Sequence, residues 1–223
     1  MEIDFGIRQR VTKLNVDLQL YGLVAWTSGN VSERLPDGKS FIIKPSGISY
    51  NDLLPSMLVV CDLDGNVIEG TYAPSSDTAA HAYVYRNMPQ VGGVVHTHSN
   101  YATAWAAIHS PIPCALTAMA DEFGGAIPLG AFALIGNDDI GKAIVETLQD
   151  SRSPAVIMKN HGIFTIGKDA QAAVKAAVMC EDVAKTTWIA KTMGVIHEID
   201  SEDIDRLYNR YQNVYGQKQG EEK

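Results

Sequence analysis

The chain has 223 residues, of which 46% are hydrophobic and 20% are charged. This length fits one large domain or two small ones and is sufficient to enclose a hydrophobic core. Eighteen Lys and Arg side chains against 26 Asp and Glu give a formal net charge of -8. The negative charge argues against nucleic acid and an anionic membrane as partners, but it does not exclude a small anionic ligand.

The cysteines and the start of the chain indicate the compartment. Cys61, Cys114 and Cys180 are far apart, odd in number and in no CxxC pattern, so we expect neither a disulfide framework nor a cysteine zinc site. The N-terminus lacks the apolar stretch of a signal peptide, and no apolar run approaches about 18 residues. We therefore expect a cytoplasmic protein in a reducing environment.

The first part of the chain predicts one helix followed by short strands. Asp4 can cap a helix whose apolar residues recur at three- and four-residue steps, with Gly22 at its C-terminal end. Turn sequences then separate several β-type segments, which we expect to form hairpins. These segments are Leu23 to Trp26, Val31 to Leu35, Ser40 to Ile43 and Met57 to Cys61.

From Pro74 onward, helices and strands alternate. Helices are predicted from near Ser75 to before Pro89, Ser99 to about Ile108, Asp138 to Leu148, Asp169 to Met193, and Ile204 to about Val214. Strands are predicted from Gly93 to His98, Ala155 to Met158 and Ile163 to Ile166, whereas the Pro- and Gly-rich stretch from Pro111 to Gly130 fits no element. We expect a single α/β domain over 1–223, a mixed sheet with helices on both faces, and a frayed tail over 217–223.

Two histidines end one of the predicted strands. His96 and His98 lie two residues apart, so both side chains face the same side and can bind one ion. The alternative is that one is a buried core residue and the other is exposed. His161 follows another apolar strand, and Gly162 beside it allows close approach of the backbone. Three histidines with a carboxylate or water form a catalytic zinc site.

Two residues of the following helix are candidates for the fourth ligand. Asp77 lies at the predicted start of the helix, and His81 lies one turn later on the same face. For Asp77 the alternative is a helix cap. For His81 the alternatives are a supporting contact to the metal site or simple packing within the helix.

A second group of residues is suited to phosphate. Ser75 and Ser76 lie at a helix N-terminus, where free N–H groups and the helix dipole favour an anion. The segment 44–47, Lys44-Pro45-Ser46-Gly47, offers a cation beside a glycine turn, and 28–30, Ser28-Gly29-Asn30, is a loop whose amides can cradle an anion. Each segment alone is also ordinary turn chemistry.

Together these segments resemble a known family over about residues 7 to 217. The order and spacing of the motifs are similar to those of the class II sugar-phosphate aldolases, and especially of their L-ribulose-5-phosphate 4-epimerase branch. Asp77 favours the epimerases, because fuculose-phosphate aldolases carry Glu at this position. The motifs are Gly29-Asn30-Val31-Ser32, Lys44-Pro45-Ser46-Gly47, Pro74-Ser75-Ser76-Asp77-Thr78, His96-Thr97-His98-Ser99 and Asn160-His161-Gly162.

The resemblance implies a largely antiparallel, three-layer class II aldolase-like fold and a set of site residues. A divalent ion, Zn²⁺ or alternatively Mn²⁺ or Co²⁺, is held by Asp77, His96, His98 and His161. The substrate phosphate is held by Gly29, Asn30, Lys44, Ser46, Gly47, Ser75 and Ser76. Asp121 and Tyr215 form the acid–base pair and reach the site from an adjacent subunit of a homotetramer.

The implied reaction is inversion at C4 of a pentulose 5-phosphate, from L-ribulose 5-phosphate to D-xylulose 5-phosphate. It proceeds by cleavage of the C3–C4 bond, rotation of the aldehyde fragment and re-addition. A phosphorylated ketose is thus the expected substrate. The alternatives are a class II aldolase acting on L-fuculose 1-phosphate or a related sugar, and a non-catalytic adducin-like binding module.

Overall fold

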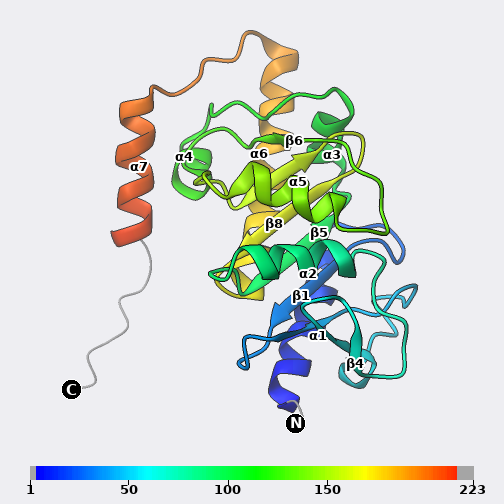
Figure 1. Ribbon diagram of the computed structural model, residues 1–223. Coiled ribbons are helices and arrows are strands. Elements are labelled where there is room, and N and C mark those ends of the chain that lie inside the picture. The colour runs from blue at the N-terminus through cyan, green and yellow to red at the C-terminus, as the bar shows by residue number, and fades with distance from the viewer. Residues whose placement is uncertain (1–3, 215–223) are drawn as a thin grey trace, which may run out of the picture.

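A mixed sheet forms the centre of the fold in the computed structural model, which describes residues 4–214 (Figure 1). Within that range the sheet has eight strands in the order β4-β3-β2-β1-β5-β8-β7-β6. Neighbouring strands are antiparallel except for the parallel pair β6 and β7, which confirms the predicted mixed, largely antiparallel sheet. The strands are β1 (Asn30–Arg34), β2 (Ser40–Ile43), β3 (Val59–Asp62), β4 (Val67–Glu69), β5 (Gly93–Thr97), β6 (Leu129–Gly130), β7 (Ala155–Met158) and β8 (Ile163–Gly167).

Helices cover both faces of the sheet. Helices α2 and α5 pack on one face, and α1, α3, α4 and α6 pack on the other (Figure 1). The predicted three-layer arrangement is therefore confirmed. The helices are α1 (Phe5–Leu20), α2 (Thr78–Asn87), α3 (Asn100–Ala107), α4 (Thr117–Phe123), α5 (Asp139–Leu148), α6 (Ala170–Met193) and α7 (Ser201–Val214), with a 3-10 turn at Pro55–Met57. Within residues 4–214, no helix has the length and apolar character needed to cross a membrane.

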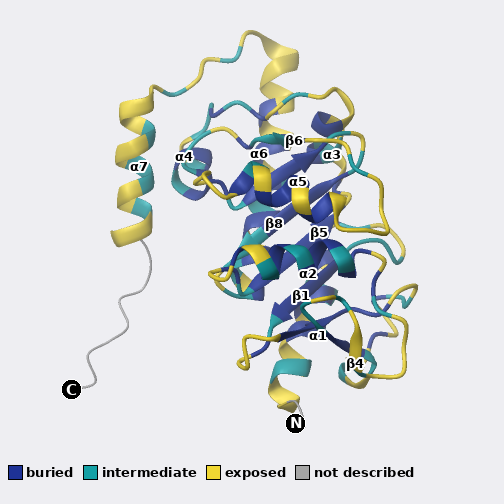
Figure 2. Ribbon diagram, in the orientation of Figure 1, coloured by how far each residue is buried: buried dark blue, intermediate teal, exposed yellow. Residues whose placement is uncertain are grey.

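The core lies on both sides of the central strands. Val94 of β5 belongs to the cluster under α2 and α5, whereas its neighbour Val95 belongs to the cluster under α1 and α6. Val156 and Ile157 of β7 divide between opposite sides in the same way. Because both faces are covered, these strands are buried throughout and their sequences are continuous apolar runs (Figure 2).

Some elements differ from those predicted. The segment from Leu23 to Trp26 is not a strand. Instead, Ser28 donates from its backbone N–H to the carbonyl of Ala25 over 3.1 Å, and Trp26 has a φ of 57°. This turn points the chain into β1, and an apolar sequence alone does not reveal it.

The sequence also failed to predict α4, β4 and β6 and placed the start of α7 three residues late. Helix α4 has only seven residues, and it is stabilised by burial of Met119 and Phe123 and by packing against α6 and α7. Strand β6 is a two-residue pairing with β7. Elements this short carry no readable periodicity, so tertiary packing decides them.

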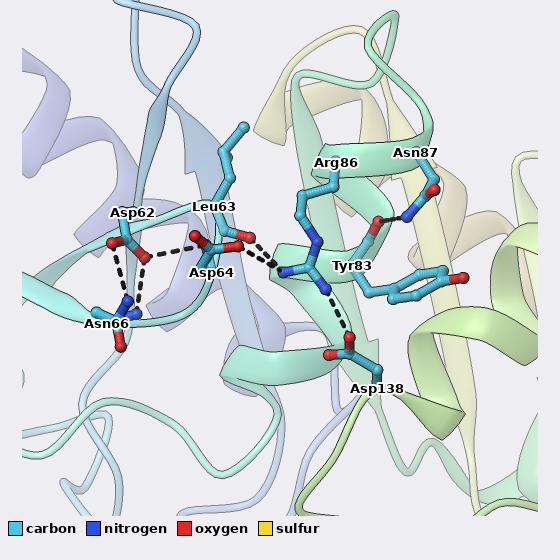
Figure 3. Close-up of polar contacts among 8 residues, drawn as sticks. All are labelled: Asp62, Leu63, Asp64, Asn66, Tyr83, Arg86, Asn87 and Asp138. Atoms are coloured by element: carbon cyan, nitrogen blue, oxygen red, sulfur yellow. Dashed lines mark hydrogen bonds and ion pairs between the residues drawn. The ribbon is translucent and has the colours of Figure 1, made fainter.

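Arg86, near the end of α2, ties three parts of the fold together. Its guanidinium donates to the Leu63 carbonyl in the turn between β3 and β4 and to Asp138 Oδ2 over 2.7 Å, at the start of α5 (Figure 3). Asp64 lies 3.8 Å from the same guanidinium. Asp62 organises the turn by accepting two backbone N–H groups. These contacts fix the orientation of α2, whose other end begins at Asp77.

Asn15 connects α1 to the central strand β1. Its side chain is fully buried, accepts the Val31 N–H over 2.8 Å and donates to the carbonyls of Val11 and Val31 over 2.9 and 3.3 Å. A polar side chain inside an apolar helix face is thereby paired with the backbone. This anchor lies next to Asn30, the first residue of β1.

We expect Asn15→Ala to lower the free energy of unfolding by about 1–3 kcal/mol, because it leaves a buried Val31 N–H without its partner. Urea unfolding followed by circular dichroism measures the change. Asn213→Ala is the control, because Asn213 is exposed and its side chain bonds the Asn209 carbonyl within α7, and it should shift stability by less than about 0.5 kcal/mol. Equal effects of the two variants would contradict the anchoring role.

Candidate active site

The pairing of β5 with β8 brings three histidines together. Thr97, the last residue of β5, pairs with Ile163, the first residue of β8. His98 follows the one strand directly and His161 precedes the other by two residues, so antiparallel pairing places both at the same edge as His96. The ring nitrogens of the three residues lie within 4.8 Å of one another. The structure thus brings together the three histidines that the sequence singled out.

A backbone carbonyl orients the central imidazole. His96 Nδ1 lies 2.9 Å from the carbonyl oxygen of Ile163. Because that oxygen only accepts, Nδ1 carries the proton and Nε2 presents a lone pair. This Nε2 lies 2.9 Å from His98 Nε2, so two ring nitrogens converge on one point. A histidine whose second nitrogen bonds a carbonyl is the usual arrangement in metal sites.

All three imidazoles are held in the neutral form. Burial lowers the pKa of His96 to about 3, and burial also lowers the pKa values of His98 and His161. Their lone pairs are therefore available at neutral pH, and protons compete little with a cation. His96 is buried, His161 is half-buried and His98 is exposed. One side of the cluster is thus open to solvent, as a site that admits substrate requires.

Gly162 leaves the room in which the histidines meet. A Cβ atom at this position would lie 2.5 Å from the Thr97 carbonyl oxygen and 2.6 Å from His98 Cδ2. It would also lie 3.2 Å from His96 Cε1. The first two distances are shorter than real contacts allow, so only glycine fits between the two strand ends.

The turn before Gly162 is supported by a residue that the sequence analysis placed in no motif. Asn160 has a φ of 54°, and its Oδ1 atom lies 2.5 Å from His109 Nε2. His109 follows α3 and is distant in sequence, so neither composition nor spacing links it to the site. Its contact holds the turn that carries His161.

Asp77 faces the site and does not cap its helix. Asp77 is the first residue before α2, yet its side chain makes no capping hydrogen bond. Instead, its Oδ2 accepts from Asn30 Nδ2 over 2.8 Å, and the same amide donates to Ser75 Oγ over 2.9 Å. The cap interpretation of Asp77 is therefore wrong.

The Asp77 carboxylate is buried and ionised. Burial acts to raise its pKa, but the nearby His96 and His81 and the Asn30 hydrogen bond outweigh burial, so the pKa lies below its usual value. Its Oδ1 atom is buried and has no hydrogen-bond partner among residues 4–214. The ligand atoms within 4.8 Å of one another belong to the three histidines and do not include Asp77. Its role as a fourth ligand stays a prediction.

A buried lysine lies beside this carboxylate region. Lys44 is 1% exposed, and its Nζ donates to the carbonyls of Thr27 and Pro45 over 3.4 and 3.3 Å and lies 4.8 Å from the centre of the Tyr50 ring. Among residues 4–214 no carboxylate pairs with it. Burial lowers its pKa to about 8. A buried ammonium without a carboxylate partner favours an anionic ligand nearby.

Three loops that are distant in sequence form one cradle. The Ser75 N–H donates to the Lys44 carbonyl over 3.1 Å, and Pro45 forms a β-bridge with Pro74. Asn30 connects the first segment to the other two through its hydrogen bond to Ser75 Oγ. The segments 28–30, 44–47 and 74–77 are thus adjacent, as the phosphate hypothesis requires. Ser46, Gly47 and Ser76 are exposed on this cradle.

Gly29 fits the loop tightly against β5. Its φ is +78°, and a Cβ atom would lie 2.6 Å from Val24 Cγ1 and 2.8 Å from the His96 carbonyl oxygen. Glycine is therefore needed both for the backbone conformation and for the close approach. The contact places the loop 28–30 directly against the backbone of His96.

Asp121, one of the two predicted acid–base residues, lies outside this group. Asp121 is on α4, where its Oδ2 lies 3.5 Å from Arg210 of α7 and its Oδ1 is buried without a hydrogen-bond partner in the described range. Tyr215 lies outside the described residues. The roles of both stay predictions.

The chain belongs to a known family. Residues 9–188 match the model of the Class II Aldolase and Adducin N-terminal domain, which covers most of the chain, so the chain is a member of that family. Family members use a divalent metal, and the three-histidine cluster is the group in the described range that could hold one. The resemblance predicted from the motifs is confirmed at the level of the family.

Solved structures agree with this assignment. An L-fuculose 1-phosphate aldolase is 26% identical, with a TM-score of 0.86 and coverage of 95% of this chain and 98% of the aldolase. The L-fuculose-1-phosphate aldolase of Thermus thermophilus is 24% identical, with a TM-score of 0.72 and coverage of 84% and 95%. A sugar-phosphate aldolase of Thermotoga maritima shares the fold at 18% identity, with a TM-score of 0.71 and coverage of 86% and 97%.

We expect Gly162→Ala to weaken zinc affinity about 10-fold or more, because the added methyl group displaces His98 or the Thr97 carbonyl. Competition with a chromophoric chelator at pH 7 measures the affinity. Gly194→Ala serves as the control, since a Cβ atom there meets nothing within 4 Å. Unchanged zinc affinity in Gly162→Ala would show that the cluster does not bind the metal in this geometry.

Proposed function

We propose that this protein is a metal-dependent enzyme that cleaves and re-forms a carbon–carbon bond in a phosphorylated ketose. One observation carries the proposal. Three neutral imidazoles converge within 4.8 Å, and the ionised Asp77, bonded to Asn30, connects them to a cradle that contains the buried Lys44. A cation site and an anion site therefore share one polar network, which suits a substrate with a carbonyl and a phosphate.

His96, His98 and His161 would hold the ion, with Asp77 as the proposed fourth ligand. Zinc suits the three imidazoles, and Mn²⁺ or Co²⁺ are the alternatives. When bound, the ion supplies a Lewis acid for the negative charge that develops on the ketone-bearing fragment as the C3–C4 bond breaks. Neutral imidazole ligands leave the ion its positive charge.

The cradle would retain the aldehyde fragment. The hydroxyls of Ser46, Ser75 and Ser76 and the positive end of the α2 dipole favour a phosphate, and Gly29, Asn30 and Gly47 shape the loops around it. The ammonium of Lys44 adds positive charge. Holding the phosphate keeps the aldehyde close while it rotates, so that the bond can re-form on its other face.

Asp121 and Tyr215 would exchange the C4 hydroxyl proton on opposite sides of the aldehyde. During cleavage one of them takes the proton from the C4 oxygen as the C3–C4 electron pair passes to the ketone fragment. During re-addition the other returns a proton to that oxygen. Asp121 pairs with Arg210 of α7 and is not part of the three-histidine cluster, and we propose that Asp121 and Tyr215 serve the site of a neighbouring subunit in a homotetramer.

Within this chemistry we favour epimerisation of L-ribulose 5-phosphate to D-xylulose 5-phosphate. Asp77 in place of Glu and the closing Tyr215-Gly216-Gln217 support it. Aldol cleavage is a second candidate, favoured by the 26% identity to an L-fuculose 1-phosphate aldolase. A non-catalytic adducin-like role is disfavoured, because a purely structural domain has no need of three converging neutral histidines.

Two assays on the zinc-loaded protein distinguish these functions. With L-ribulose 5-phosphate we expect D-xylulose 5-phosphate by NMR and no accumulation of a triose fragment. With L-fuculose 1-phosphate we expect no rapid release of a triose phosphate to a coupled reductase. Triose release without epimerisation would assign the aldolase activity. Zinc binding without turnover of either sugar would support the binding module and contradict our proposal.

We expect Tyr215→Phe to lower turnover about 10²–10⁴-fold, the usual contribution of a general acid or base. Its zinc content, measured by atomic absorption, should equal that of the wild type because the tyrosine is not a proposed ligand. Unchanged turnover would exclude proton transfer by Tyr215.

A mixing experiment tests whether Tyr215 acts on a neighbouring subunit. His98→Ala and Tyr215→Phe are each expected to be inactive, but mixed tetramers contain sites with both residues intact. Activity should therefore return when the two variants are unfolded and refolded together. No recovery in tetramers shown to be mixed would place Tyr215 in its own subunit's site.

A further inference from the structure

His81 lies next to the histidine cluster without belonging to it. The residue is on α2, one turn after Asp77, and its side chain is fully buried. Phe164 lies between it and the cluster: the ring of Phe164 stacks on His96 at 4.1 Å and meets the edge of His81 at 6.1 Å. His81 is therefore a buried imidazole that the proposed function leaves without a role.

A chain of hydrogen bonds holds one side of the His81 ring. Its Nδ1 lies 2.7 Å from Ser32 Oγ, which in turn lies 2.8 Å from the Tyr85 hydroxyl. Ser32 is on β1, and Tyr85 is one turn beyond His81 on α2. All three residues are buried, so every proton in this chain needs a defined position.

The direction of the chain follows from its far end. In the described residues, Ser32 Oγ is the hydrogen-bond partner of the Tyr85 hydroxyl. Tyr85 must then use its own proton toward Ser32, and Ser32 uses its proton toward His81 Nδ1. In the reverse direction the Tyr85 proton would have no acceptor. His81 thus accepts at Nδ1 and carries its proton on Nε2.

Two buried polar atoms near this chain each lack a hydrogen-bond partner in the described range. Among residues 4–214, His81 Nε2 and Asp77 Oδ1 both lack a hydrogen-bond partner. One is an N–H donor and the other is an acceptor, and they are four residues apart on one helix face. A buried unpaired group costs about 1–3 kcal/mol, so mutual pairing relieves both.

In the structure the two atoms do not bond to each other, and we propose that His81 is a positioning residue whose Nε2–H turns onto Asp77 Oδ1 when a cation binds at the three-histidine cluster. Asn30 holds the other oxygen over 2.8 Å, so the carboxylate is gripped from both sides and its plane is fixed. Each oxygen keeps a second lone pair for the metal ion. The inference rests on the proposed function in that a divalent cation binds at the three-histidine cluster with Asp77 as its fourth ligand, and it is independent of the sugar that is converted.

Two substitutions separate the two nitrogens of His81. The amide of His81→Asn can replace Nδ1 as the acceptor for Ser32, but it is too short to reach Asp77. The longer His81→Gln places an NH₂ group near the position of Nε2 and keeps a donor for Asp77. A role in packing alone predicts that both variants behave alike.

We expect His81→Asn to weaken zinc affinity about 10–100-fold, whereas His81→Gln stays close to the wild type. Chelator competition at pH 7 measures the affinity, and urea unfolding of the zinc-free variants checks that they are folded. His197→Gln, at an exposed position, is the control. Equal losses in the two His81 variants, a greater loss in His81→Gln, or no loss in either would overturn the proposal.

NMR of the ¹⁵N-histidine-labelled wild type tests the same idea without a substitution. Long-range ¹H–¹⁵N spectra report which nitrogen carries the proton, and we expect the Nε2–H form for His81 in the zinc-free and zinc-loaded protein. The Nδ1–H form would overturn the proposal. Failure of the sugar assays with the expected zinc affinities and tautomer would contradict the proposed function alone.

Discussion

The antiparallel pairing of β5 with β8 is the constraint on which the site depends. The register that joins Thr97 to Ile163 places the end of one strand against the start of the other. This register also supplies the Ile163 carbonyl that orients His96 and the narrow gap that Gly162 occupies. A slip by one residue would turn His96 to the opposite face of the sheet and separate it from its partners. The metal site is therefore a property of strand register.

Helix α2 and the segment before it position several other residues near the three histidines. The segment just before the helix supplies Ser75 and Asp77, the helix itself supplies His81 and Tyr85, and near its end Arg86 binds the neighbouring turn and the start of α5 (Figure 3). Surface contacts of Arg86 thus fix the C-terminal end of the helix, and buried contacts of Ser75 and Asp77 fix its N-terminal end. The position of α2 also places His81 and Tyr85 within hydrogen-bond distance of Ser32 in the chain of buried polar groups.

Opposite charges are kept apart within a small buried region. Lys44 and Asp77 are both buried, yet Asp77 bonds to Asn30 and Lys44 bonds to backbone carbonyls. Had the two paired directly, each would have neutralised the other. Their separation leaves a positive group for an anionic ligand and a negative group for a cation, and Asn30 and Ser75 bridge the two halves. An acidic protein can therefore present a locally positive pocket.

The sequence by itself determined the long helices and the chemistry of the site. Asp4 and Asp169 cap their helices as such residues do locally, and His96, His98 and His161 are recognisable because strand periodicity and short motifs are local signals. Only the tertiary structure decided that Asp77 bonds Asn30 rather than its own helix, that His109 supports Asn160, and that α4 forms. These features depend on contacts between segments far apart in the chain. Local sequence does not encode which distant group will pair with a given donor or acceptor, or which distant side chains will cover a given apolar face.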